Sequence, residues 1–152
     1  RWAGHTGTTH ELAAAARLGA DVPFCLVGGR ARVQGIGEIV DPLPFAAIDI
    51  TLVIPPLACS TVEVYRAWDA LGGPLAADHG TVNDLEPAAL QIEPRLVRWR
   101  DRITDAAGSR PTLAGSGATW FLQGHHDLAA ALPEAMVVHT RTDRPQQPAD
   151  GR

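Results

Sequence analysis

The sequence contains no lysine, and all 13 of its basic residues are arginine. This removes a residue type that many phosphoryl-transfer sites use, and it excludes from these residues a phosphate loop of the P-loop type, whose motif contains a lysine. No stretch approaches the roughly 20 consecutive apolar residues that span a bilayer. The net charge of −4 gives no electrostatic reason for nucleic-acid binding. We therefore expect neither a membrane nor a nucleic acid as a partner.

Only two cysteines are present, Cys25 and Cys59, and both lie in apolar surroundings. Their separation matches no metal or redox spacing, so we expect buried free thiols, as in a cytoplasmic protein. No metal site is expected. The chain has no visible signal peptide and begins at Arg1 instead of methionine, as a fragment or an incomplete reading frame does.

The composition is that of a folded protein, because 45% of the 152 residues are hydrophobic and 20% are charged. In the first third, the pattern predicts a helix over 10–18 with Thr9 as its N-cap. Pro23 disfavours helical angles at Val22, and Gly28 with Gly29 forms a turn. A strand or hairpin is expected over 30–43. Residues 1–45 are interpreted as the remnant of a first unit.

The second unit is expected over 46–140. It begins with a strand at 48–56, whose apolar run suggests that both faces are covered. Helices follow from the capping box of Ser60 and Glu63, from Asn83 and from Pro94. Two strands around a glycine turn, a helix over 126–133 and a strand over 135–141 complete an α+β fold. Its order is close to ferredoxin-like β-α-β-β-α-β with an extra helix. The Pro-rich polar residues 141–152 are expected to be a disordered tail.

A single carboxylate, Asp21, stands in the otherwise apolar stretch GADVPFCL. If Asp21 is buried without a partner, ionising it is expensive, so it needs either partners or a chemical role. One interpretation is a turn residue that bonds nearby backbone amides. The other is a general base, which typically contributes roughly 10²- to 10⁴-fold to a rate.

The stretch LAGSGATWF, residues 113–121, places Ser116 between Gly115 and Gly117. Glycines allow a backbone to approach a phosphate and to present its N–H groups. A tight hairpin turn explains the same residues without function.

Three further clusters allow both a structural and a functional interpretation. Tyr65 lies four residues after Thr61, on one helix face, and is either a core aromatic or a platform for a planar base. A helix start accounts for the polar residues of NDLEP as caps. The paired histidines lack a third ligand at a metal spacing and are expected to be solvated. These clusters comprise Asn83, Asp84, Glu86, His125 and His126.

The combination of GADVPF, GIGE, STVEVYRA, NDLEPAAL and GSGATWF, over about residues 10–123, resembles a known family. It is similar to the C-terminal half of the 4-diphosphocytidyl-2-C-methyl-D-erythritol kinases. This family belongs to the GHMP kinase superfamily, named for its galactokinase, homoserine kinase, mevalonate kinase and phosphomevalonate kinase members. The resemblance implies the GHMP kinase fold, ATP and Mg²⁺ as cofactors, and the small molecule 4-diphosphocytidyl-2-C-methyl-D-erythritol as substrate.

By the same resemblance, Asp21 matches the catalytic aspartate and Tyr65 the aromatic that stacks on cytosine. Thr61 lies at a matching substrate-side position. The family's glycine-rich motif near the transferred phosphate corresponds to Gly115, Ser116 and Gly117. The family's N-terminal ATP-binding half has no counterpart here, including the lysine that accompanies its catalytic aspartate.

Two alternatives remain beside a kinase that needs its other half. One is a non-catalytic remnant that binds a small ligand or a partner chain. The other is a different kinase of the same superfamily, such as homoserine or mevalonate kinase, which has no cytosine platform.

Overall fold

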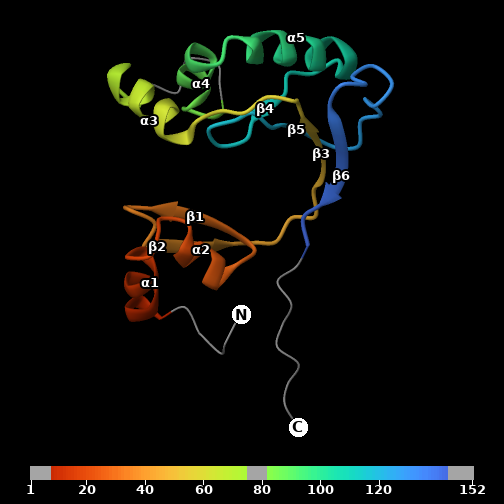
Figure 1. Ribbon diagram of the computed structural model, residues 1–152. Coiled ribbons are helices and arrows are strands. Elements are labelled where there is room, and N and C mark those ends of the chain that lie inside the picture. Colours follow the sequence, from red (N-terminus) through yellow and green to blue (C-terminus); the bar gives the residue numbers. More distant parts are fainter. Residues whose placement is uncertain (1–7, 75–81, 144–152) are drawn as a thin grey trace. The chain divides into compact units, whose positions relative to one another are not determined.

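The computed structural model describes residues 8–74 and 82–143 (Figure 1). The chain divides into two compact units, with boundaries between Ala47 and Ile48 and between Arg141 and Thr142. Each unit is described by itself. Within the described residues, every helix is too short or too polar to cross a membrane.

Two short helices open the first unit. Helix α1 spans Thr9–Ala16, and Thr8 is its N-cap in a capping box with Glu11. The predicted cap therefore lies one residue too late, because the carboxylate that closes the box is three residues after Thr8. Helix α2 spans Val22–Val27. The prediction that Val22 is non-helical is wrong, since a proline in the first helical turn removes no hydrogen bond that the helix uses.

The rest of the first unit is the predicted hairpin. Strand β1, Arg30–Gln34, pairs antiparallel with β2, Ile39–Leu43. Gly37 has a φ of 99°, and a Cβ atom there would collide with the carbonyl of Ala20. Only glycine allows this turn of the hairpin to lie against the segment between α1 and α2.

The second unit is built on a four-stranded sheet. Its strands are β3 (Asp49–Ile54), β4 (Thr112–Leu113), β5 (Trp120–Gln123) and β6 (Met136–Arg141). They are ordered β4-β5-β3-β6, and every neighbouring pair is antiparallel. In the register of the central pair, Val53 faces Trp120. The strand prediction for this unit is confirmed.

Three helices pack with this sheet (Figure 1). They are α3 (Thr61–Ala70), α4 (Glu86–Ile92) and α5 (Arg95–Ala107). Ser60 accepts a hydrogen bond from the Glu63 N–H as N-cap of α3, and Pro94 precedes α5, both as predicted. The Glu63 side chain makes no return bond to the Ser60 N–H, so only half of the predicted capping box forms. The fully buried side chains at the centre come from both layers and include Val53, Val64, Leu96, Ile103 and Trp120.

Two predictions for this unit are wrong. Residues 126–133 form turns instead of a helix, and only one helical-type bond, from the Leu132 N–H to the Leu128 carbonyl, is present. Pro133 ends the segment, and burial of Leu128 and Leu132 needs only that one turn. Strand β3 also has one fully buried face, with Thr51 and Val53, while the other face is half-buried.

Most of the predicted tail, residues 144–152, lies outside the described residues. Arg141 itself is the last residue of β6, and the Thr142 hydroxyl donates to the Ala46 carbonyl at 2.7 Å.

Candidate functional site

Asp21 is exposed and immediately precedes α2. Its carbonyl accepts the Cys25 N–H at 3.1 Å, but its side chain makes no capping hydrogen bond to the helix. The buried, desolvated carboxylate considered from the sequence is therefore not what the structure shows. The neighbouring Ala20 is held against Gly37, so the backbone beside this carboxylate is fixed by packing.

The glycine stretch forms the connection of the β4–β5 hairpin. The Ala114 N–H donates to the Thr119 carbonyl at 2.8 Å, and the Gly117 N–H donates to the Ala114 carbonyl at 3.0 Å. Gly115 and Gly117 have φ values of 56° and 93°, which favour glycine at both positions. In the described part of the chain, no hydrogen bond occupies the N–H groups of Gly115 and Ser116. The loop therefore offers two N–H groups to an anion.

Helix α3 meets this loop through its first residue. The hydroxyls of Thr61 and Ser116, 55 positions apart in the sequence, are hydrogen-bonded at 2.9 Å. One turn further along α3, Tyr65 is 49% exposed, and its ring contacts Trp68 edge-on with 6.4 Å between ring centroids. The core interpretation of Tyr65 is thus wrong, and its ring is accessible to a ligand.

Cys59 lies beneath the loop. A Cβ atom on Gly117 would come within 3.2 Å of its sulfur, so a side chain there would press on the thiol. Burial, and then the negative charge of Glu93, raise the pKa of the Cys59 thiol. Cys59 is a neutral packing residue at neutral pH, whereas Cys25 is exposed, contrary to the sequence-based expectation.

The prediction that Asn83 caps the following helix is wrong, because α4 begins only at Glu86, with Leu85 as its N-cap and no side-chain capping bond. The Asn83 side chain accepts the Leu85 N–H at 3.0 Å and donates to the carbonyls of Leu113 and Gly115 at 2.9 and 2.7 Å. Asp84 accepts the indole N–H of Trp68 at 2.7 Å. No sequence signal pairs these residues with their distant partners, although the crowding of polar groups at 83–86 marks the segment.

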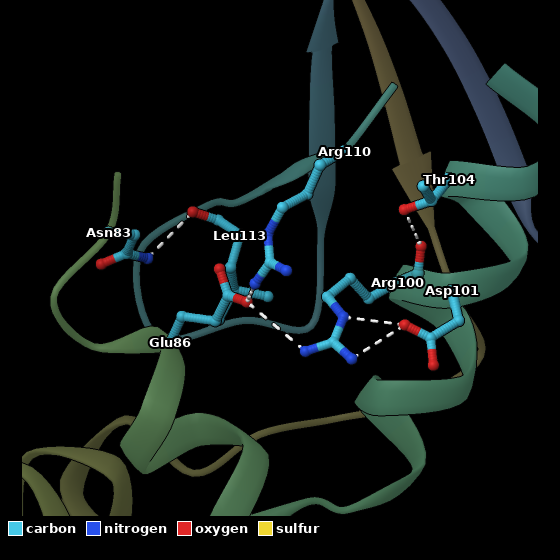
Figure 2. Close-up of polar contacts among 7 residues, drawn as sticks. All are labelled: Asn83, Glu86, Arg100, Asp101, Thr104, Arg110 and Leu113. Carbon is cyan, nitrogen blue, oxygen red and sulfur yellow. Dashed lines mark hydrogen bonds and ion pairs between the residues drawn. The ribbon is translucent and has the colours of Figure 1, made fainter. Parts of the chain in front are cut away.

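Glu86 is a buried charged residue of the second unit, at 1% exposure (Figure 2). Arg110 donates to its carboxylate at 2.6 Å, and an Arg100 nitrogen lies 4.0 Å from the same oxygen. Arg100 in turn pairs with Asp101 at 2.8 Å. These contacts tie the start of α4 to α5 and to Arg110, two residues before β4. Glu86 is structural, and its carboxylate is not available to a substrate.

We expect Glu86→Gln to lower the free energy of unfolding by about 2 kcal/mol, because the substitution replaces a buried charge-assisted pair by a neutral contact. Urea unfolding measures the change. Glu134→Gln is the matched control, since its pair with Arg102 is exposed and should contribute little. A Glu86 variant as stable as the control would contradict the structural role.

His125, His126 and His139 do not assemble a metal site with the other described residues. The His125 and His139 rings are stacked with centroids 3.7 Å apart, and a ring nitrogen of His139 lies 2.9 Å from the His126 carbonyl. Among residues 8–74 and 82–143, no cluster of three or more His, Cys, Asp or Glu side chains is arranged to hold a metal ion.

The structure thus brings together five of the six residues to which the resemblance gives a role. Thr61, Tyr65 and the loop of Gly115, Ser116 and Gly117 share one surface of the second unit. Asp21 belongs to the first unit. Chemically, the surface combines free N–H groups suited to a phosphate with an exposed aromatic ring suited to a planar base.

Comparisons with known proteins agree on one group of enzymes. The chain is 38% identical to a 4-diphosphocytidyl-2-C-methyl-D-erythritol kinase of a Nocardioides species, with 86% of this chain and 52% of that protein covered. It is 35% identical to the enzyme of the same name from Corynebacterium efficiens, with 99% and 56% covered. A crystal structure of 4-(cytidine 5'-diphospho)-2C-methyl-D-erythritol kinase matches with a TM-score of 0.66 and 28% identity, over 86% of this chain and 56% of that one. No protein-family model matches the chain.

The chain is therefore related to small-molecule kinases, with a mixed α+β fold that matches one of them in structure. More particularly, it is a partial-length homologue of 4-diphosphocytidyl-2-C-methyl-D-erythritol kinase and spans about half the length of the relatives it matches.

Proposed function

We propose that these residues are the substrate-binding part of a 4-diphosphocytidyl-2-C-methyl-D-erythritol kinase. In the complete enzyme, ATP with Mg²⁺ phosphorylates the 2-hydroxyl of 4-diphosphocytidyl-2-C-methyl-D-erythritol, a step toward isoprenoid precursors in the cytoplasm. The single observation that carries the proposal is the Thr61–Ser116 hydrogen bond. It joins the helix that bears an exposed aromatic to a loop with free N–H groups, so that one surface serves both a base and a phosphate.

In this proposal each site residue has one role. The Tyr65 ring stacks on the cytosine, Thr61 contacts the substrate, and the loop of Gly115, Ser116 and Gly117 stabilises charge on the transferred phosphoryl group. Asp21 accepts the proton of the 2-hydroxyl as the phosphoryl group is transferred. Its exposure, without a capping bond to its own helix, supports this role because the carboxylate is open to a ligand.

The proposal also covers the rest of the architecture. Residues 1–45 are then the end of an N-terminal GHMP kinase subdomain, and residues 46–140 are a C-terminal ferredoxin-like domain. The antiparallel strand order β4-β5-β3-β6 supports the latter assignment. Most contacts to ATP and Mg²⁺ are assigned to the N-terminal half that the relatives possess.

A second candidate is a small-ligand-binding module without catalysis. The surface itself supports this candidate, since the exposed Tyr65 ring and the free N–H groups of the loop need no general base to bind a ligand. This candidate shares the surface described above but not the reaction.

Calorimetric titration of the chain with cytidine 5'-diphosphate, inorganic pyrophosphate and homoserine tests the binding surface. We expect the cytidine nucleotide to bind at least roughly fivefold more tightly than pyrophosphate, because stacking of a base on an aromatic ring contributes about 1–3 kcal/mol. Preference for homoserine would indicate another kinase of the superfamily. Equal binding of nucleotide and pyrophosphate would contradict the base platform.

A further inference from the structure

We infer that Asn83 and Asp84 are positioning residues that hold the two halves of the proposed substrate surface in register. Asn83 fixes the position of the glycine loop of residues 115–117, and Asp84 fixes the position of the Tyr65 ring through Trp68. The inference rests on the proposed function, because it concerns the same surface, and it adds two residues that support that surface from behind its ligand-facing groups.

The Asn83 side chain is fully engaged. Its amide nitrogen donates to the carbonyls of Leu113 and Gly115, and its amide oxygen accepts the Leu85 N–H. Figure 2 shows the amide of Asn83 directed at the Leu113 carbonyl. One side chain therefore connects the start of α4 with the last residue of β4 and with the first glycine of the loop.

These bonds decide which way the loop presents its N–H groups. The peptide between Gly115 and Ser116 is not among the cis peptides of the chain, so its C=O and N–H point in opposite directions. Because the Gly115 carbonyl is bound by Asn83, the Ser116 N–H is turned away from Asn83 and stays free. Asn83 thus orients the N–H group that is proposed to face a phosphate.

A second set of contacts runs from Asp84 through Trp68 to Tyr65. The Trp68 indole N–H donates to Asp84 at 2.7 Å, and its ring contacts Tyr65 edge-on at an interplanar angle of 74°. The backbone of Gly73 also lies so close to the indole that an added Cβ atom would collide with the ring. Asp84 and Gly73 therefore both restrict Trp68, and Trp68 restricts the positions open to the Tyr65 ring.

The segment that carries Asn83 and Asp84 is itself held in place by Glu86. The Glu86 N–H donates to the Asn83 carbonyl at 3.0 Å, and the Glu86 carboxylate is buried against Arg110. Since adjacent residues make the two sets of contacts, a displacement of this segment would disturb the loop and the Tyr65 ring together.

Substitutions at Asn83 and at Trp68 should each weaken the binding of a different ligand. We expect Asn83→Ala to weaken pyrophosphate binding by roughly fivefold, the loss expected for misplaced hydrogen-bond donors, while binding of the nucleoside cytidine, which has no phosphate, stays within about twofold. Trp68→Phe removes the bond to Asp84 and should weaken cytidine binding but not pyrophosphate binding. Asp84→Asn retains an oxygen that accepts the indole N–H and should resemble the unsubstituted chain. Calorimetry supplies all three affinities.

Amide hydrogen exchange separates a failure of this inference from a failure of the proposed function. In the ligand-free chain, Asn83→Ala should speed exchange of the Gly117 amide by roughly tenfold, because the loop loses its anchor. Unchanged exchange at Gly117, or equal losses for both ligands in both variants, would overturn the inference. If the unsubstituted chain binds neither ligand, the proposed function fails while the exchange result still decides the role of Asn83. Should Asn83→Ala not fold, Asn83→Asp keeps the acceptor for Leu85 and removes the donors.

Discussion

Replacing Asp21 by asparagine should lower kcat by at least roughly 10²-fold in a complete chain, in which these residues follow the N-terminal part of the Nocardioides relative. The amide cannot accept the proton of the substrate hydroxyl, whereas it preserves the shape of the side chain. Because Asp21 is exposed and caps no helix, the loss would reflect chemistry rather than unfolding. Steady-state kinetics should show a reduced kcat with ATP affinity nearly unchanged.

Asp41→Asn is the matched control for this prediction. Asp41 is an exposed carboxylate of the same unit, located on β2, and its substitution should leave kcat within about twofold because no catalytic role depends on it. A complete Asp21→Asn enzyme that turns over as fast as the Asp41→Asn control would exclude the general-base role.

Replacing Tyr65 by alanine should weaken binding of cytidine 5'-diphosphate by roughly 5- to 160-fold, since base stacking on an aromatic ring contributes about 1–3 kcal/mol. The ring is 49% exposed, so its removal leaves no large cavity in the core. Calorimetry on the chain as it stands gives the change in Kd. The Tyr65→Phe variant keeps the ring and should bind nearly as well as the original.

The comparison with pyrophosphate sharpens the test of Tyr65. Pyrophosphate has no base, so its affinity should be the same in the alanine variant and in the unsubstituted chain. If both ligands weaken equally, Tyr65 supports the folded surface instead of stacking on a base.

Much of the local structure could be predicted from the sequence, because it depends on residues close together in the chain. The Ser60 cap of α3, Pro94 before α5 and the glycine turns at Gly28 and Gly117 all follow from local backbone preferences. The exceptions arise where packing decides instead. Residues 126–133 have a helical composition, yet one turn that buries two leucines is sufficient there.

The candidate site shows the same division. Thr61 and Tyr65 share a helix face by their spacing, but the contact of Thr61 with Ser116 depends on how the β4–β5 hairpin packs. Asn83 and Glu86 were interpreted as caps, because a single sequence does not reveal partners as distant as Gly115 or Arg110. Local relations such as the shared helix face could therefore be predicted here, whereas long-range hydrogen-bond partners could not.

The most direct test of the account is phosphoryl transfer by the complete chain, joined to the N-terminal part of the Nocardioides relative and supplied with ATP, Mg²⁺ and 4-diphosphocytidyl-2-C-methyl-D-erythritol. Phosphorus NMR of the product should show a new phosphomonoester on the 2-hydroxyl, formed together with ADP and lost in the Asp21→Asn variant. A folded complete chain that binds ATP and the cytidine nucleotide but forms no such ester would contradict the kinase assignment and leave the non-catalytic binding module in its place.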